Sequence, residues 1–244
     1  MRLNYFLLFL VPAALSFIQC NDEDPKKYKQ ILMIGFSHNF DNEKLVFDNQ
    51  TYLTSNGDSF TPSKLIYHVN NFQLISEDGT TYRFENKYAL INPATGNTQI
   101  ELGTFPLDDF VSLAFDLGVR DSTININGGL NDQFIDPMYW QMNSGYINFK
   151  LEGNSPSSPN EGVTMHIGGY KSGQETAQEI RLTLPNKLTN NQGLSQKKEL
   201  NINVDLSKLF SDASQLPLRY FHKIHKPGDT AQMVSKNFPN MFNF

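Results

Sequence analysis

Cysteine is nearly absent from this chain of 244 residues, because Cys20 is the only one. A single thiol cannot close a disulfide within the chain. Excess positive charge is also absent: 25 acidic and 20 basic residues give a formal net charge of −5 at pH 7. A nucleic-acid-binding surface needs a basic patch or stripe, so we expect no nucleic-acid partner.

Long apolar runs are rare, and the clearest one lies at the N-terminus between about residues 5 and 18. It follows one basic residue, Arg2, and is too short and too close to the start for a comfortable transmembrane helix. These features predict a secretory signal peptide over residues 1–19. The run ends at Cys20, which predicts a bacterial lipoprotein acylated on that thiol, although Gln19 stands where a smaller residue is commoner. The alternative is a plain secreted protein with one free or buried cysteine.

The residues after the predicted lipidation site read "NDEDPKKYKQ", which is polar and charged. We interpret residues 20–30 as a tether, and the acidic start resembles the surface-export signal of Bacteroidetes-type lipoproteins. The predicted location is therefore the outer membrane or the cell surface. Arg2 is the one charged residue among residues 1–19, so removal of this segment changes the net charge from −5 to −6. Once Cys20 is acylated, no thiol remains for catalysis or for a metal site.

Familiar catalytic motifs are missing as well. The chain contains no GxSxG, P-loop or GxGxxG pattern, and no nucleophile stands in an evident relation to a base. We therefore expect a binding protein rather than an enzyme. The segments "DNEKLVFDNQ" and "GLNDQFID" cluster Asp and Asn residues that are able to bind a structural calcium ion, but neither has the EF-hand order, and solvated turns are the simpler interpretation.

Alternation of apolar and polar residues dominates the rest of the chain. It is clearest in "LMIGFSHNF", "KLIYHVNNFQL", "VSLAFDLGV", "YINFKLEG" and "ELNINVDLSKLF". A period of two indicates half-buried strands, and the segments between them are rich in turn residues. We predict a single all-β domain over residues 31–244: a β-sandwich with long loops, including 154–162, and a C-terminal segment that is helical in part near "DTAQMVSKNF".

Three of the five histidines lie within predicted strands. His38 shares a face with apolar residues, His68 shares one with Ile66, Asn70 and Phe72, and His166 is followed closely by two glycines. If each lay near a strand end, the three imidazoles would converge at one rim of the sandwich and form a mononuclear site. Imidazole suits copper or zinc, and nearby thioethers would favour Cu(I). The candidate thioethers are Met138, Met142 and Met165. A histidine within a strand is otherwise a core residue, and His222 and His225 in "RYFHKIHKPG" are interpreted as surface residues.

Several motifs follow one another in a familiar order. They are "IGFSHNF", "YHVNNFQLISEDG", "FDLGV", "MYWQMNSGYINFKLEG", "MHIGGY" and "NINVDLSKLF". This order resembles the MbnP-like family, which is named for a copper-binding protein associated with methanobactin. The resemblance covers roughly residues 30–244. The most specific parts are the block from Trp140 to Gly153 and its spacing to His166.

The resemblance implies a secreted or lipid-anchored β-sandwich with one copper site, holding Cu(I) or Cu(II), built largely from histidine. His38 and His166 match family histidines, and His68 is a variable extra ligand. Trp140 matches a family tryptophan that, in some relatives, a dihaem peroxidase-type partner oxidises to kynurenine. This chain departs from the pattern at Met142, where the family has a second tryptophan, and at Met165, where it has phenylalanine.

Two functions are carried forward from the sequence. The first is an extracytoplasmic copper-binding lipoprotein that sequesters the metal or passes it on. Its affinity should weaken as pH falls through about 6.5, because protonated imidazole does not bind metal. The second is a non-catalytic surface module that binds a glycan or an envelope protein. In that case exposed aromatic residues such as Tyr139, Tyr146 and Tyr170 would stack on sugars.

Overall fold

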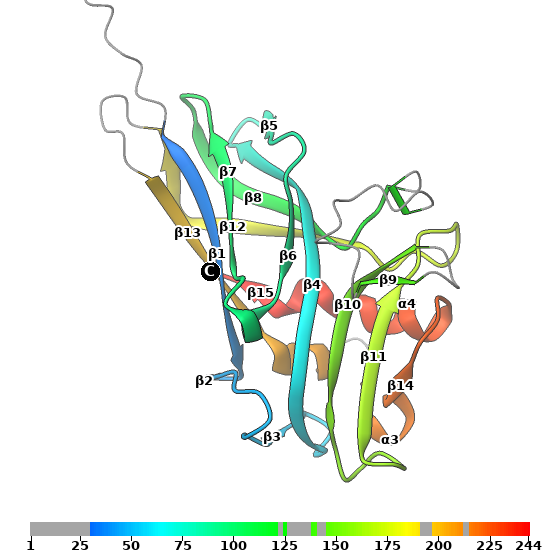
Figure 1. Cartoon of the computed structure of the whole chain (residues 1–244). Coiled ribbons are helices and arrows are strands. Elements are labelled where there is room, and N and C mark those ends of the chain that lie inside the picture. The colour runs from blue at the N-terminus through cyan, green and yellow to red at the C-terminus, as the bar shows by residue number, and fades with distance from the viewer. Residues whose placement is uncertain (1–29, 122–123, 126–137, 141–144, 191–196, 212–214) are drawn as a thin grey trace, which may run out of the picture.

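The computed structural model describes residues 30–121, 124–125, 138–140, 145–190, 197–211 and 215–244. Within these ranges the chain forms two β-sheets whose inner faces share one core (Figure 1). The prediction of an all-β sandwich is confirmed. No helix in the described part is long and apolar enough to cross a membrane, while the predicted signal peptide, Cys20 and most of the tether lie outside the described residues.

The smaller sheet is centred on β1 (Ile31–Phe40). One neighbour is β13 (Lys197–Asp205), which runs parallel to β1 although it comes from the far end of the chain. The remaining strands of this sheet are β2 (Glu43–Lys44), β7 (Gln99–Thr104) and β15 (Phe242–Asn243). The sheet therefore joins the beginning and the end of the domain.

The larger sheet is centred on the long strand β4 (Ser59–Ser76), which lies between β8 (Asp109–Leu117) and β10 (Gly145–Asn154). Beyond β8 lies β12 (Gln178–Thr189), and beyond β10 lies β11 (Gly162–Gly168). Short strands complete the sheet: β3 (Tyr52–Leu53), β5 (Thr81–Arg83), β6 (Tyr88–Ile91), β9 (Tyr139–Trp140) and β14 (Lys223–Ile224).

The alternating residues of β1 are buried on one face of the strand, as the sequence predicts. Leu32, Ile34, Phe36, His38 and Phe40 are all buried, and they face the larger sheet. The Phe36 ring meets an aromatic ring of β4 at a centroid separation of 6.2 Å and one of β8 at 5.9 Å. Aromatic rings in such edge-to-face contacts contribute through both burial and quadrupole geometry. They hold the two sheets together.

Register shifts in β4 and β10 interrupt alternation that the sequence suggests is continuous. In β4 the register shifts between Asn70 and Gln73, where Asn71 has a φ of 56°. In β10 the register shifts between Ile147 and Phe149. Each extra residue moves the following side chains to the other face. As a result Phe149 enters the core while Ile147 packs on the outside of the sheet, and the prediction that they share a face is wrong.

The C-terminal segment is helical in short pieces, as predicted. It contains η2 (Leu206–Phe210), α3 (Leu218–Phe221), α4 (Asp229–Ser235) and η3 (Phe238–Met241). A further short helix, η1 (Pro93–Thr95), lies between β6 and β7. In α4 the N-cap is Gly228 rather than Asp229. The predicted loop at 154–162 is confirmed between the ends of β10 and β11. Element η3 contacts both sheets, so the tail closes the sandwich.

Candidate metal site

His38 lies inside the sandwich. Its Nε2 atom shares a hydrogen bond of 2.9 Å with the hydroxyl of Tyr67 on β4, so the pair links the two sheets through the core. Burial lowers the pKa of His38 to about 4 and raises the pKa of Tyr67 well above its ordinary value. Both groups are therefore neutral at pH 7, as a buried polar pair needs to be.

His68 is the next residue along β4 and consequently points to the opposite, outer face of the larger sheet. Its ring meets the Tyr146 ring edge-on at a centroid separation of 5.3 Å, and only 1% of the residue is exposed. Burial lowers the pKa of His68 to about 3. The structure therefore places His68 under Tyr146 and on the other side of the sheet from His38.

His166 also lies on the outer face, on β11, because its neighbours Met165 and Ile167 are fully buried in the core. Its Nε2 atom is 2.8 Å from Oε1 of Glu152, and Oε2 of Glu152 is 2.8 Å from Nζ of Lys64. Burial opposes ionisation of Glu152, but the bonds from Lys64 and His166 outweigh it and hold the carboxyl pKa below its usual value. This carboxylate orients the His166 ring.

His225 is the imidazole that comes closest to His166. The two ring centroids are 5.3 Å apart and the rings are nearly perpendicular, at 89°. The contact arises because β14 pairs in parallel with β11, with Thr164 opposite Lys223 and Met165 opposite Ile224. The next residue after Ile224 is then brought alongside His166. The sequence identified His225 as a surface residue, which it is, but gave no sign of this neighbour.

The surroundings of this pair favour neutral imidazole. Burial lowers the pKa of His166; its bond to Glu152 works the other way, and Lys150 lowers the pKa further. For His225 burial and Lys223 lower the pKa, and Glu152 partly offsets them. Neutral imidazole is the form that binds metal. The two rings therefore stay competent as ligands below the ordinary histidine pKa of 6.5.

Trp140 lies on the same outer face. Its strand β9 pairs with the start of β10, and its ring packs against a cluster formed by Ile66, Leu90, Met138 and Ile147. Trp140 Cζ3 is 3.0 Å from the position that a Cβ on Gly168 would occupy. Gly168 is two residues from His166 on β11, a spacing of about 7 Å along one face of a strand. The indole and the histidine pair are therefore neighbours on this surface.

The expectation that three histidines converge at one rim is not met. The larger sheet separates His38 from His166, and His68 packs against Tyr146 rather than against another imidazole. Met165 points into the core, away from the face that carries His166, and Met142 lies outside the described residues. In the part of the chain that the structure describes, no three His, Cys, Asp or Glu side chains lie close enough to hold a metal ion. The predicted calcium segment "GLNDQFID" lies entirely outside that part.

The residues of this face fit a soft or borderline metal only in part. They supply two imidazoles in ring contact, a carboxylate beside one of them, and an indole that packs against the buried thioether of Met138. Imidazole nitrogen suits copper or zinc. Of the aromatic residues proposed for sugar stacking, Tyr146 is not available to a ligand, because it is 1% exposed and packs between His68 and Tyr139.

The fold and this surface define a two-sheet β-sandwich protein with paired histidines on the outer face of its larger sheet. Residues 29–225 match the sequence model of the MbnP family. The chain therefore belongs to the MbnP family, as its motifs indicated. A solved structure, MbnP from Methylosinus trichosporium, is similar over 78% of this chain and 80% of that one, with 16% identity and a TM-score of 0.53. No protein with a curated description matches the chain.

Proposed function

We propose that this protein binds copper outside the cytoplasm and sequesters it or hands it on, with His166 and His225 as its main ligands. The observation that carries the proposal is the ring contact between these two histidines, at 5.3 Å, in a chain of the MbnP family. Copper is here the cargo of a binding protein and not the cofactor of an enzyme.

The environment of the pair supports this choice over the interior histidine. His38 is bonded to Tyr67 in the core, so a metal there would have to displace that bond and enter between the sheets. His166 and His225 are on the outer face, and the side chain of His166 is 17% exposed. Neutral imidazoles persist below pH 6.5 at this site, which moves the expected acid loss of copper below that value.

Titration of the apo-protein with Cu(I) and with Cu(II), in competition with a chelator, tests the assignment. His166→Ala and His225→Ala should each weaken copper binding by more than about tenfold, because loss of even an outer-shell partner costs about that much. The matched control is His222→Ala, which removes a half-buried histidine of the same segment. Loss of copper in His38→Gln, with full binding in His225→Ala, would place the metal in the core and contradict the proposal.

The proposal extends to Trp140. Its ring is partly buried on the face that carries His166, so oxidation to kynurenine by a dihaem peroxidase-type partner would add a new polar group beside the histidine pair. Peptide mass spectrometry of protein from its native host should show the kynurenine mass shift at Trp140. An unmodified indole in copper-loaded native protein would show that the site works without this step.

We also propose that Cys20 carries the lipid anchor that holds the protein on the outer membrane or the cell surface. The support is the apolar run before Cys20 and the charged tether after it. Labelled palmitate should enter the wild-type protein and not the Cys20→Ser variant, which should leave the membrane fraction. Label in Cys20→Ser would exclude this cysteine as the acylation site.

A further inference from the structure

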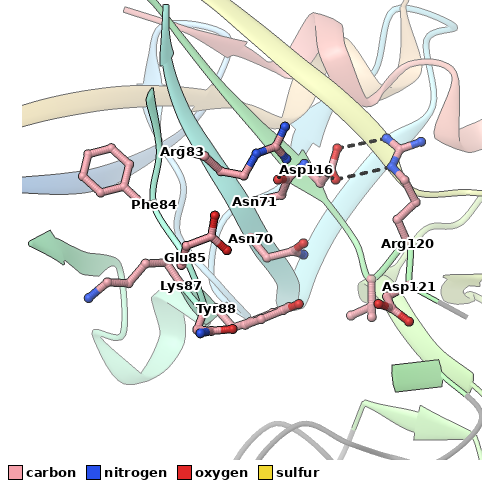
Figure 2. A pocket seen from close by; sticks show the side chains of 12 residues that line it. Asn70, Asn71, Arg83, Phe84, Glu85, Lys87, Tyr88, Asp116, Arg120 and Asp121 are labelled. Carbon is pink, nitrogen blue, oxygen red and sulfur yellow. Dashed lines mark hydrogen bonds and ion pairs between the residues drawn. The ribbon is translucent and has the colours of Figure 1, made fainter. Parts of the chain in front are cut away.

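A hollow lies on the larger sheet, and neither His166 nor His225 is among the residues that line it. It encloses about 370 Å³ and forms where the bulge of β4, the turn before β6 and the loop after β8 meet. A pocket of this volume lies at the lower end of the range for small-molecule sites. Figure 2 shows the side chains of Asn70, Glu85, Tyr88 and Asp116 arranged around it.

One wall is a continuous chain of planar polar groups. Arg83 donates to Oδ1 of Asn71 at 2.6 Å, and Nδ2 of Asn71 donates to Asp116 at 3.0 Å. On its other side, Asp116 accepts two hydrogen bonds from Arg120, at 2.9 and 3.3 Å, which Figure 2 marks with dashed lines. Each member is held by its neighbours, so the wall is organised before any ligand arrives.

The bulge in β4 creates this wall. Asn71 adopts a left-handed φ of 56°, a conformation that asparagine tolerates better than most residues. The bulge turns Asn71 towards Asp116, and Asn70 donates from Nδ2 to the carbonyl oxygen of Gly118 at 2.7 Å. That bond fixes the plane of the Asn70 amide at the edge of the pocket. Asp116 itself is 3% exposed, so its carboxylate is committed to this framework.

An aromatic ring forms the opposite side. Tyr88, at the start of β6, is partly buried and packs against the cluster of Val119 and Tyr146. Figure 2 shows its ring edge-on beneath the side chains of Asn70 and Glu85, so that one face is turned to the hollow. A flat ring opposite fixed amide, carboxylate and guanidinium groups offers an apolar surface and a polar rim to the same ligand.

The charges around the pocket balance. Among the described residues, three cationic and three anionic ones line it: Arg83, Lys87, Arg120, Glu85, Asp116 and Asp121. A site for a phosphate or a carboxylate needs an excess of donors and positive charge. A metal cation would need clustered carboxylates, and the described residues hold no such group of three. The lining therefore favours a neutral ligand with many hydroxyl groups, which both donate and accept hydrogen bonds.

We propose that this pocket binds a neutral sugar unit of a glycan. The Tyr88 ring would lie against the C–H face of the sugar, and the polar wall from Arg83 to Arg120, with Asn70, would bond its hydroxyls. The site is independent of copper, because it shares no residue with the His166–His225 pair. The stacking residue in this proposal is Tyr88, which lines a cavity, and not Tyr146, which the sequence suggested and which is buried.

Saturation-transfer NMR on the full purified protein tests this proposal. The probes are glucose, galactose, mannose and N-acetylglucosamine, with glucuronic acid and glucosamine as the charged comparisons. At least one neutral sugar should receive saturation, and the Kd for the strongest responder should rise about tenfold in Tyr88→Ala, since stacking on an aromatic ring contributes about that factor. The matched control is Tyr220→Ala, a tyrosine that is 70% exposed on α3 and distant in the chain from the pocket.

A second variant guards against a folding defect in Tyr88→Ala. Glu85 is exposed, so Glu85→Lys should fold normally while adding positive charge at the rim; it should raise the response to glucuronic acid. Binding of the neutral sugar should be unchanged in His225→Ala and after copper removal. The proposal fails if no neutral sugar binds, if the charged sugars bind better to the wild type, or if Tyr88→Ala and Tyr220→Ala behave alike.

Discussion

The two deeply buried histidines predict a strong dependence of stability on pH. Folding holds the pKa of His38 at about 4 and that of His68 at about 3, compared with 6.5 in the unfolded chain. Below pH 6.5 the unfolded chain therefore binds protons that the folded protein does not, so stability falls as the solution is acidified. This loss of stability is absent well above pH 6.5. It begins near that value and grows until the pH reaches the pKa values of the folded protein.

The size of the effect follows from those values. Between pH 7 and pH 5 each histidine should remove about 2 kcal/mol from the free energy of unfolding, and the two together about 4 kcal/mol. That is a large share of the 5–15 kcal/mol typical of a domain. Carboxyls with lowered pKa, such as Glu152, lose their contribution only below about pH 4.5, so this pH interval isolates the histidines. His166 and His225 act in the same direction, but they are more exposed and contribute less.

Urea unfolding at pH 7 and pH 5, followed by the fluorescence of the single tryptophan, measures this difference. His38→Gln and His68→Gln should each reduce the pH-dependent loss by about half, because glutamine does not titrate in this range, and the double variant should remove most of it. An equal free energy of unfolding at both pH values, or a full loss that persists in the double variant, would refute the reasoning.

Two further predictions concern the outer face. Gly168→Ala should cost about 1–3 kcal/mol and shift the Trp140 emission, because its Cβ would lie 2.5 Å from a backbone oxygen of β10 and 3.0 Å from the indole; Gly162→Ala on the same strand, whose nearest contact is at 3.8 Å, should be nearly neutral. Glu152→Gln should lower the pKa of His166 further, since the carboxylate raises it, and NMR titration of the ring protons checks the direction; a rise would contradict the assigned role.

The two-residue period of the strands could be predicted because one face of each strand must avoid water, and that requirement is local to the strand. The four apolar residues of the alternating face of β1, and His38 among them, are buried as the pattern predicts. The helix at residues 229–235 also lies within the segment for which the sequence predicts helix. The order of motifs also identified the family. None of these conclusions needs knowledge of which strands become neighbours.

The faces and neighbours of the histidines were decided only by the tertiary structure. A bulge changes the face of every residue after it, and Asn71 in β4 and Asn148 in β10 resemble ordinary strand residues in sequence. His38 and His166 both look like strand histidines, yet the larger sheet lies between them.

The sequence by itself determined the β-sandwich class and the family, and it proposed His166 and Trp140 as candidate site residues. The tertiary structure decided that His166 meets His225 rather than His38, because a two-residue strand near the C-terminus pairs in parallel with β11. Such a contact depends on long-range pairing at a sheet edge, where a few backbone hydrogen bonds fix the position of a side chain. No local periodicity encodes it.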